Sequence, residues 1–229
     1  MKLEIVKKLK AQELNQVFDF YGNYYQYDNY QFRDQLEIIV KDKAPSDLKA
    51  FKDMTPDLLT VMINPGSSRP IDKSYIPPNI ELFEEVGGLN NHIQIVPDVA
   101  QYAIAKIMVL MGFEHTKVIN LSDLREPKSN LFYKALDVLP EGHSIFSDSR
   151  RTELDSIADS RPTVLIATGK SMKPKARELA NLATQYFEQK ALRIIGVKDE
   201  KDGTYLYPSP PLQSMKDRYL EKLSASHIE

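Results

Sequence analysis

The sequence predicts an α/β fold with three layers, in which helices cover both faces of a four-stranded parallel sheet. Two observations support this prediction: short apolar runs recur along the chain, and stretches with helical spacing separate them. The runs are five or six residues long and almost continuously apolar, as expected for strands covered on both faces. The four expected strands are Leu58–Ile63, Lys117–Leu121, Thr163–Ala167 and Leu192–Val197.

Three segments carry the signals of the covering helices. Between the first two strands, the segment 98–111 has apolar residues at helical spacing, with Asp98 as N-cap and Gly112 as terminator. After the third strand, Pro174 stands where a first helical turn begins, and an apolar stripe follows it to Phe187. We expect the last helix at Leu212–Leu223.

The first 45 residues are rich in tyrosine and phenylalanine. Aromatic residues at strand spacing usually pack in a sheet, so we expect an N-terminal hairpin extension with a turn at Gly22–Asn23 and a strand at Gln35–Val40. Tyrosines interleaved with lysine and arginine would alternatively stack on nucleic-acid bases. Because no low-complexity linker divides the chain, we expect one domain over residues 1–229.

Composition excludes several classes of protein. Apolar residues make up 42% and charged residues 27%, which is the balance of a globular chain. A net charge of −2 excludes the overall basic field of non-specific DNA binders, so any nucleic-acid contact must be local. The absence of cysteine excludes disulfides, thiolate nucleophiles and cysteine-ligated zinc.

Metal and membrane signals are also weak. The four histidines do not pair at the spacing that places two imidazoles on one helix face, and we expect His143 to be exposed in a loop. We therefore expect neither a metal nor a cofactor. The segment 1–14 has no unbroken apolar stretch, which predicts a cytoplasmic protein without a signal peptide or a membrane span.

The carboxyl ends of the four strands are the predicted functional region, because ligands of open parallel sheets bind there. Each end is rich in small polar or turn-forming residues: 64–68, 120–123, 168–171 and 207–211. The long connection Gly66–Pro97 leaves the first end and has the length of a lid or binding loop. Arg125 follows the carboxyl end of the second strand and is a candidate for the site, although arginines are more often solvated at the surface.

The turn Gly169-Lys170-Ser171 is not a P-loop, since Val164 stands where that motif requires glycine. Two interpretations remain: its free amides bind an anion, or it is a plain helix entry with a solvated lysine.

Taken in order, the four strand ends resemble the motifs of the uracil-DNA glycosylase superfamily. The segment 62–66, Met-Ile-Asn-Pro-Gly, resembles the first motif of its mismatch-specific and thymine-DNA glycosylase branches. Val118–Leu121 resembles the second strand, and Tyr207–Pro210 resembles the final loop. The chain is also similar to uncharacterised bacterial and phage proteins that share an Asn-Pro-Ser first motif. The resemblance spans roughly residues 58–220 and implies a uracil-DNA glycosylase-like sheet.

The resemblance implies a hydrolase that cleaves the N-glycosidic bond of a base in DNA or in a nucleotide. The carbonyl oxygen of Asn64 would orient a water, and the hydroxyl of Tyr207 would donate to the departing base. Asn120 offers one acceptor and two donors in a plane, which suits the edge of a base. The remaining expected substrate-binding residues are Pro65, Gly66, Ser67, Ser68, Gly169, Lys170 and Ser209.

Two departures from the family pattern leave other functions open. The first motif lacks the acidic residue that the uracil-specific branch uses to activate water, and Tyr207 stands where the family has histidine. One alternative is a binding protein of the same fold that recognises nucleic acid or a nucleotide without turnover. Another is a hydrolase of free nucleosides or nucleotides. The same turns would alternatively be ordinary connections between strands and helices.

Overall fold

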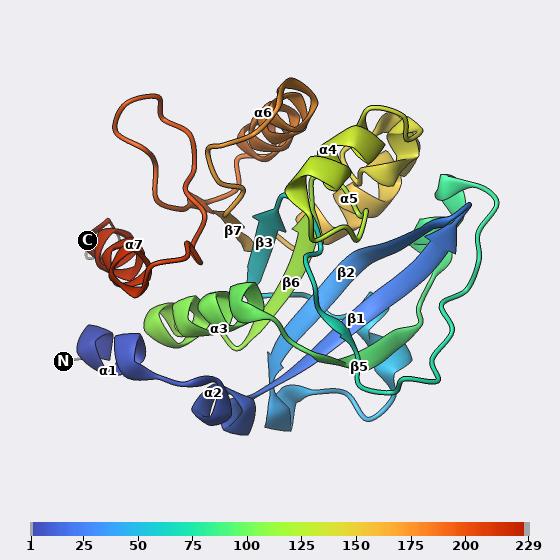
Figure 1. Cartoon of the computed structure of the whole chain (residues 1–229). Coiled ribbons are helices and arrows are strands. Elements are labelled where there is room, and N and C mark those ends of the chain that lie inside the picture. Colours follow the sequence, from blue (N-terminus) through green and yellow to red (C-terminus); the bar gives the residue numbers. More distant parts are fainter. Residues whose placement is uncertain (1, 227–229) are drawn as a thin grey trace.

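The computed structural model describes residues 2–226 and shows an α/β protein built on one mixed sheet (Figure 1). The strands are β1 (Phe18–Tyr27), β2 (Tyr30–Val40), β3 (Leu58–Met62), β4 (Arg69–Pro70), β5 (His92–Val96), β6 (His115–Asn120), β7 (Thr163–Ile166) and β8 (Ile194–Ile195). The α-helices are α1 (Lys2–Lys8), α2 (Ala11–Val17), α3 (Val99–Met111), α4 (Ser129–Leu136), α5 (Arg151–Ala158), α6 (Pro174–Gln189) and α7 (Gln213–Ala225). Short 3-10 helices lie at Lys41–Lys43, Leu48–Lys52, Phe83–Gly88, Glu141–His143 and Asp148–Arg150.

The sheet corrects the prediction of a four-stranded parallel sheet. It has eight strands in the order β4-β5-β1-β2-β6-β3-β7-β8. The four expected strands are present as β3, β6, β7 and β8, and each pairs in parallel with its neighbour among them. The other four strands pair antiparallel, including β2 with β6, so antiparallel pairing prevails across the sheet. The expectation was wrong because it counted only continuously apolar runs, which are typical of strands buried on both faces.

The aromatic segment forms the expected hairpin, but its turn and its place in the fold differ from the prediction. β1 runs through Gly22 and Asn23, and the chain turns at Asp28, where φ is +53°. β2 then pairs with β6, so the hairpin lies inside the sheet. Its aromatic rings pack in the interior: the rings of Tyr25 and Phe32 stack at a centroid distance of 4.9 Å.

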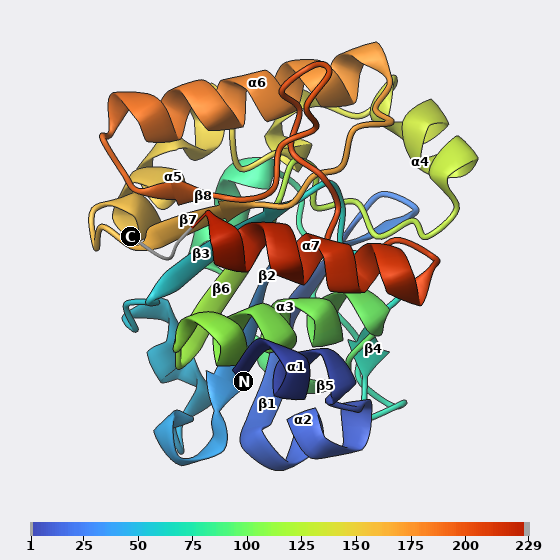
Figure 2. The ribbon, with the colours of Figure 1, turned by 90° about the vertical axis from the view of Figure 1, so that its left-hand side faces the viewer.

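Helices cover both faces of the sheet, which gives the three expected layers (Figure 2). On one face, α1, α2, α3 and α7 contribute side chains to one apolar core. On the other face, α4, α5 and α6 contribute to a second core. Within residues 2–226, no helix is both long and apolar enough to cross a membrane.

The structure confirms the expected limits of α3. Asp98 lies just before the helix in extended backbone, and its Oδ1 accepts hydrogen bonds from the amides of Ala100 and Gln101. Gly112 ends the helix in the left-handed region, with φ +82°. Pro174 begins α6, also as expected.

The interior contains ionisable groups that the sequence analysis placed at the surface or did not discuss. His143 is only 1% exposed, so the expectation of a surface histidine was wrong. Burial lowers its pKa to about 4, which keeps its imidazole neutral. Glu37 is fully buried and binds Lys117 Nζ at 2.9 Å and His115 Nε2 at 2.8 Å. Among residues 2–226, no group of three or more histidines and carboxylates is placed to hold a metal ion.

Candidate functional site

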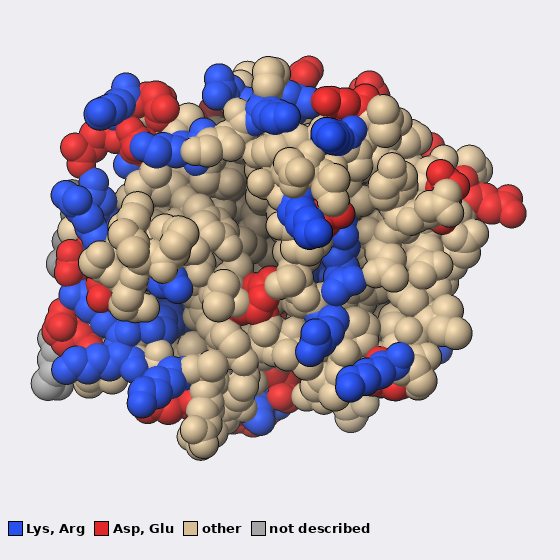
Figure 3. Space-filling model, in the orientation of Figure 1, with Lys and Arg blue, Asp and Glu red and all other residues tan. Residues whose placement is uncertain are grey.

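A cleft of about 620 Å³ lies beyond the carboxyl ends of β3, β7 and β8. From β3 the chain crosses to β6 on one side, whereas β7 and β8 lie on the other side. The strand order therefore reverses between β3 and β7, which is where open α/β sheets bind ligands. Ile63, which follows β3, and the segment 168–172, which follows β7, both line the cleft. Figure 3 shows a hollow in this face, between the regions covered by α3, α4 and α7.

Three of the expected site residues line this cleft: Gly169, Lys170 and Tyr207. Gly169 has a φ of +83°, and a Cβ atom there would lie 3.3 Å from Tyr207 Cβ. The glycine therefore allows the turn after β7 to approach the final loop closely. Burial, and to a smaller extent the nearby carboxylate of Asp98, raise the pKa of Tyr207 to about 12. The Tyr207 hydroxyl consequently stays protonated near neutral pH and can donate a hydrogen bond.

Positive charge exceeds negative charge in the lining of the cleft. Lys170 pairs with Asp199 at 2.8 Å, and a second ion pair joins Lys222 to Glu200 at 2.6 Å. Lys201 and Arg218 also line the cleft, and neither forms a salt bridge within residues 2–226. The cleft therefore favours a ligand with negative charge.

The loop after β3 is tied to the N-terminus of α3 by Asp98. The amide of Ser67 donates to Asp98 Oδ2 at 3.1 Å. Gly66 has a φ of +71°, and a Cβ atom there would lie only 2.6 Å from the same oxygen. Only glycine allows this close approach without strain. The sequence analysis identified Asp98 as a helix cap alone and missed this second contact.

Asn64 follows Ile63, which lines the cleft, but is not itself among the lining residues; it is half-buried, and the next residue, Pro65, is buried. The Nδ2 of Asn64 donates to the carbonyl oxygen of Glu126 at 2.8 Å. Within the described part of the chain, its carbonyl oxygen forms no hydrogen bond, so this oxygen is the atom available to a ligand or a water.

Asn120 lies at the same edge of the sheet as Asn64, but it is closed off from the cleft. Its backbone pairs in register with Met62, two residues before Asn64. The side chain is 0% exposed, and neither its amide nitrogen nor its carbonyl oxygen has a hydrogen-bond partner within residues 2–226. A buried polar group without a partner is rare in folded proteins and requires an explanation.

Two of the serines expected to bind substrate, Ser68 and Ser209, contact protein groups. Ser209 is 7% exposed and donates to the carbonyl oxygen of Val99 at 3.3 Å. Ser68 is 1% exposed and contacts Arg33 and Arg125. Ser67 remains exposed at the surface of the loop. Arg33 was not among the expected site residues because it lies in the aromatic hairpin, which the sequence analysis assigned to packing.

The comparisons with known proteins add no relative. No protein-family model matches the chain, and neither a curated protein nor a solved structure shows a significant match.

Proposed function

We propose that the chain is a hydrolase of the glycosylase type, which cleaves the N-glycosidic bond of a base in a nucleic acid or a nucleotide. The observation that carries the proposal is the cleft at the reversal of strand order, where Tyr207 presents a protonated hydroxyl in a positively charged lining. Its volume of about 620 Å³ lies within the usual range for small-molecule sites. The four parallel strands would then be a uracil-DNA glycosylase-like core, extended by β1, β2, β4 and β5.

Cleavage of the N-glycosidic bond does not require a strong general base. The reaction proceeds through an oxocarbenium-like sugar and a departing anionic base, so the site must stabilise negative charge and position a water. Tyr207 would donate its hydroxyl hydrogen to the base as its charge develops. The free carbonyl oxygen of Asn64 would orient the attacking water, and an amide oxygen suffices because the water attacks late.

The test is release of a base from oligonucleotides that contain uracil, a thymine mismatch or hypoxanthine, and from the corresponding free nucleotides. Tyr207→Phe removes only the hydroxyl, and loss of one such donor lowers kcat by about 10²- to 10³-fold in comparable sites. Tyr205→Phe is the matched control, because Tyr205 lies two residues away on the same segment. Absence of base release from every substrate, at any enzyme concentration, would refute the proposal.

A second candidate function is binding of the same ligands without turnover. Two observations favour it: the amide nitrogen of Asn64 is already bonded to Glu126, and Asn120 does not reach the cleft. Salt-sensitive binding of a nucleotide or an oligonucleotide, with the ligand recovered intact, would identify this function.

A further inference from the structure

Two arginines converge on Ser68 beside the candidate functional site. Arg33 belongs to β2, and its Nη1 donates to Ser68 Oγ. Arg125 follows β6, and its Nε donates to the carbonyl oxygen of Ser68 at 2.9 Å. Arg33 is 1% exposed, whereas Arg125 is only partly buried. Arg125 therefore forms the accessible side of this pair.

Residues of the β1–β2 hairpin position the Arg33 side chain next to Ser68. Tyr24 lies opposite Arg33 in the register of β1 and β2, directly after an irregularity in the pairing between Asn23 and Tyr24. Such irregularities bend a strand locally and change the direction in which a side chain points. A Cβ atom on Gly22 would lie 2.8 Å from the Tyr24 ring and 3.3 Å from Arg33 Cδ. The glycine therefore makes room for both side chains.

The charges of the two arginines are poorly balanced by the protein. Within residues 2–226, neither guanidinium forms a salt bridge; Arg125 Nη1 donates to the neutral Gln31 Oε1 at 2.8 Å. In the described part of the chain, Arg33 Nε is buried and has no hydrogen-bond partner. Burial lowers the pKa of the Arg33 guanidinium; Tyr24 and the carboxylate of Asp98 oppose this effect, and Arg125 adds to it. Asp98 is the carboxylate that acts on Arg33, but it forms no salt bridge with it within residues 2–226, and a buried charge without an ion-pair partner is costly.

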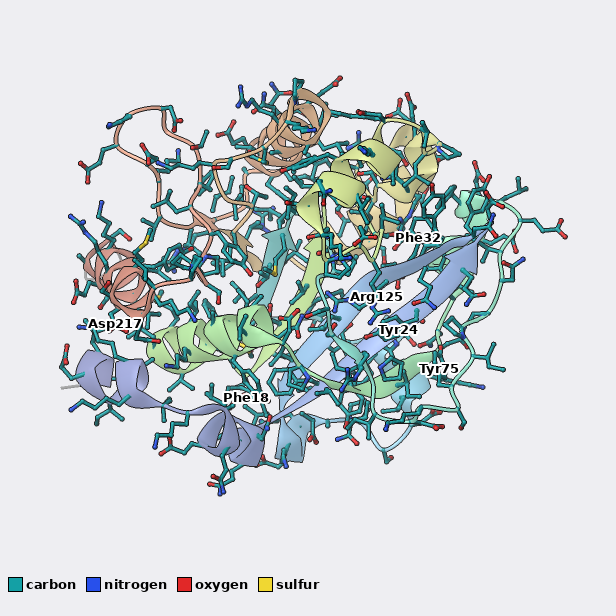
Figure 4. All side chains as sticks on the ribbon, in the orientation of Figure 1. Phe18, Tyr24, Phe32, Tyr75, Arg125 and Asp217 are labelled. Atoms are coloured by element: carbon teal, nitrogen blue, oxygen red, sulfur yellow. The ribbon has the colours of Figure 1, made fainter. Side chains whose placement is uncertain are left out.

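We propose that Arg33 and Arg125 form a binding site for a phosphate group. The planar guanidinium of Arg125 contacts the phosphate directly, and Arg33 supplies a second positive charge from beneath. Figure 4 shows Arg125 above Tyr24, and its Cζ lies 6.0 Å from the centre of the Tyr24 ring. In the same orientation, Figure 3 shows basic side chains on this part of the face, beside the hollow.

The phosphate site and the cleft share one neighbour, Asp98. The amide of Ser67, next to Ser68 of the phosphate site, donates to Asp98 Oδ2 at 3.1 Å, and the same carboxylate acts on the Tyr207 hydroxyl in the cleft. A nucleotide or strand whose base enters the cleft would therefore carry its phosphate past Asp98 to the arginines. This connection rests on the proposed function, whereas the phosphate site itself rests on the arginine geometry alone.

The experiment compares ligands that differ in phosphate, by isothermal titration calorimetry on the full chain. The probes are inorganic phosphate, thymidine, thymidine 5′-monophosphate and an oligothymidylate without terminal phosphates. We expect the monophosphate or the oligothymidylate to bind at least tenfold more tightly than thymidine. A preference for the monophosphate identifies a terminal phosphate as the ligand group, and a preference for the oligothymidylate identifies a diester.

Arg125→Gln should abolish the preference for phosphate-bearing probes, and Arg125→Lys should reduce it, because lysine keeps the charge but not the planar fork. Arg151→Gln is the matched control: Arg151 also lies over a tyrosine ring, at 5.0 Å from that of Tyr186, but on α5. Equal binding of thymidine and both phosphate-bearing probes overturns the proposal. So does an Arg125→Gln variant that retains the preference, or an Arg151→Gln variant that loses it. Base release plays no part in this readout, so failure of the glycosylase proposal leaves the phosphate site standing.

Discussion

The replacement Asn120→Leu is expected to stabilise the protein, because it removes two buried polar groups that lack partners among the described residues. The Asn120 side chain is 0% exposed, and neither of its polar groups has a hydrogen-bond partner within residues 2–226. Each buried polar group without a partner costs about 1–3 kcal/mol. Leucine has the same branching at Cγ and removes both costs, although its larger methyl groups add about 1 kcal/mol or more of strain. We expect a net gain of about 2 kcal/mol in the free energy of unfolding, or about 4–8 °C in Tm.

The measurement is urea unfolding, with Asn23→Leu as the matched control. Asn23 is also an asparagine in a strand and is 1% exposed, but its side chain is fully engaged. It donates to Asp34 Oδ2 at 3.3 Å and to the Leu89 carbonyl at 3.4 Å, and it accepts from the Asn91 amide at 3.0 Å. Asn23→Leu should therefore lower the free energy of unfolding, in contrast to Asn120→Leu. If both variants lose stability to a similar extent, the Asn120 amide is satisfied within the protein and the reasoning from its missing partners is wrong.

Three further predictions concern the supports of the site. Asp98→Ala should lower the free energy of unfolding by about 1–2 kcal/mol through loss of the helix cap, whereas Asp98→Asn keeps the cap and loses only the contact with the Ser67 amide, so it should cost less; equal stability of both variants in urea would contradict the role of the cap. Gly66→Ala should destabilise the protein more than Gly112→Ala, because both glycines have positive φ but only the Cβ at position 66 meets an obstacle, Asp98 Oδ2 at 2.6 Å; the reverse order would show that backbone strain alone decides. His143 titrates with a pKa of about 4 in the folded protein against 6.5 when unfolded, so the unfolded state binds the proton first, and about 3 kcal/mol of stability is lost as the pH falls from 6.5 to 4. The difference in unfolding free energy between wild type and His143→Gln, measured at pH 7 and at pH 4.5, should shrink by most of that amount, and a constant difference would exclude a neutral buried imidazole.

The sequence predicted the parallel part of the fold because the signals there are local. Continuous apolar runs indicate strands buried on both faces, and Asp98, Gly112 and Pro174 mark helix ends through backbone chemistry that needs no tertiary context. The antiparallel half was missed in part because its strands depend on tertiary packing and not on local signals. Gly22 and Asn23 have the composition of a turn, but tertiary packing requires the glycine inside β1, next to Tyr24 and Arg33.

Only the part of the candidate site that lies at the ends of the parallel strands could be predicted from the sequence. Parallel strands bring their carboxyl ends to one edge, so the sequence sufficed to place Gly169, Lys170 and Tyr207 near each other. It could not show that Asn120 turns into the interior, because the direction of a side chain at a strand end depends on the pairing register. Nor could it connect Arg33 with Arg125, since 92 positions separate them and their meeting depends on the antiparallel pairing of β2 with β6.

The two outermost strands of the sheet, β4 and β8, are each only two residues long. A long, flat outer strand would offer a row of free amide and carbonyl groups on which another chain could add a strand. Here the longest strands, β1 and β2, each have a second partner besides one another: β5 pairs with β1 at 21–23, and β6 pairs with β2 at 36–39. The molecule thus offers other copies only short outer strands, and mutations that lengthen β4 or β8 would promote self-association.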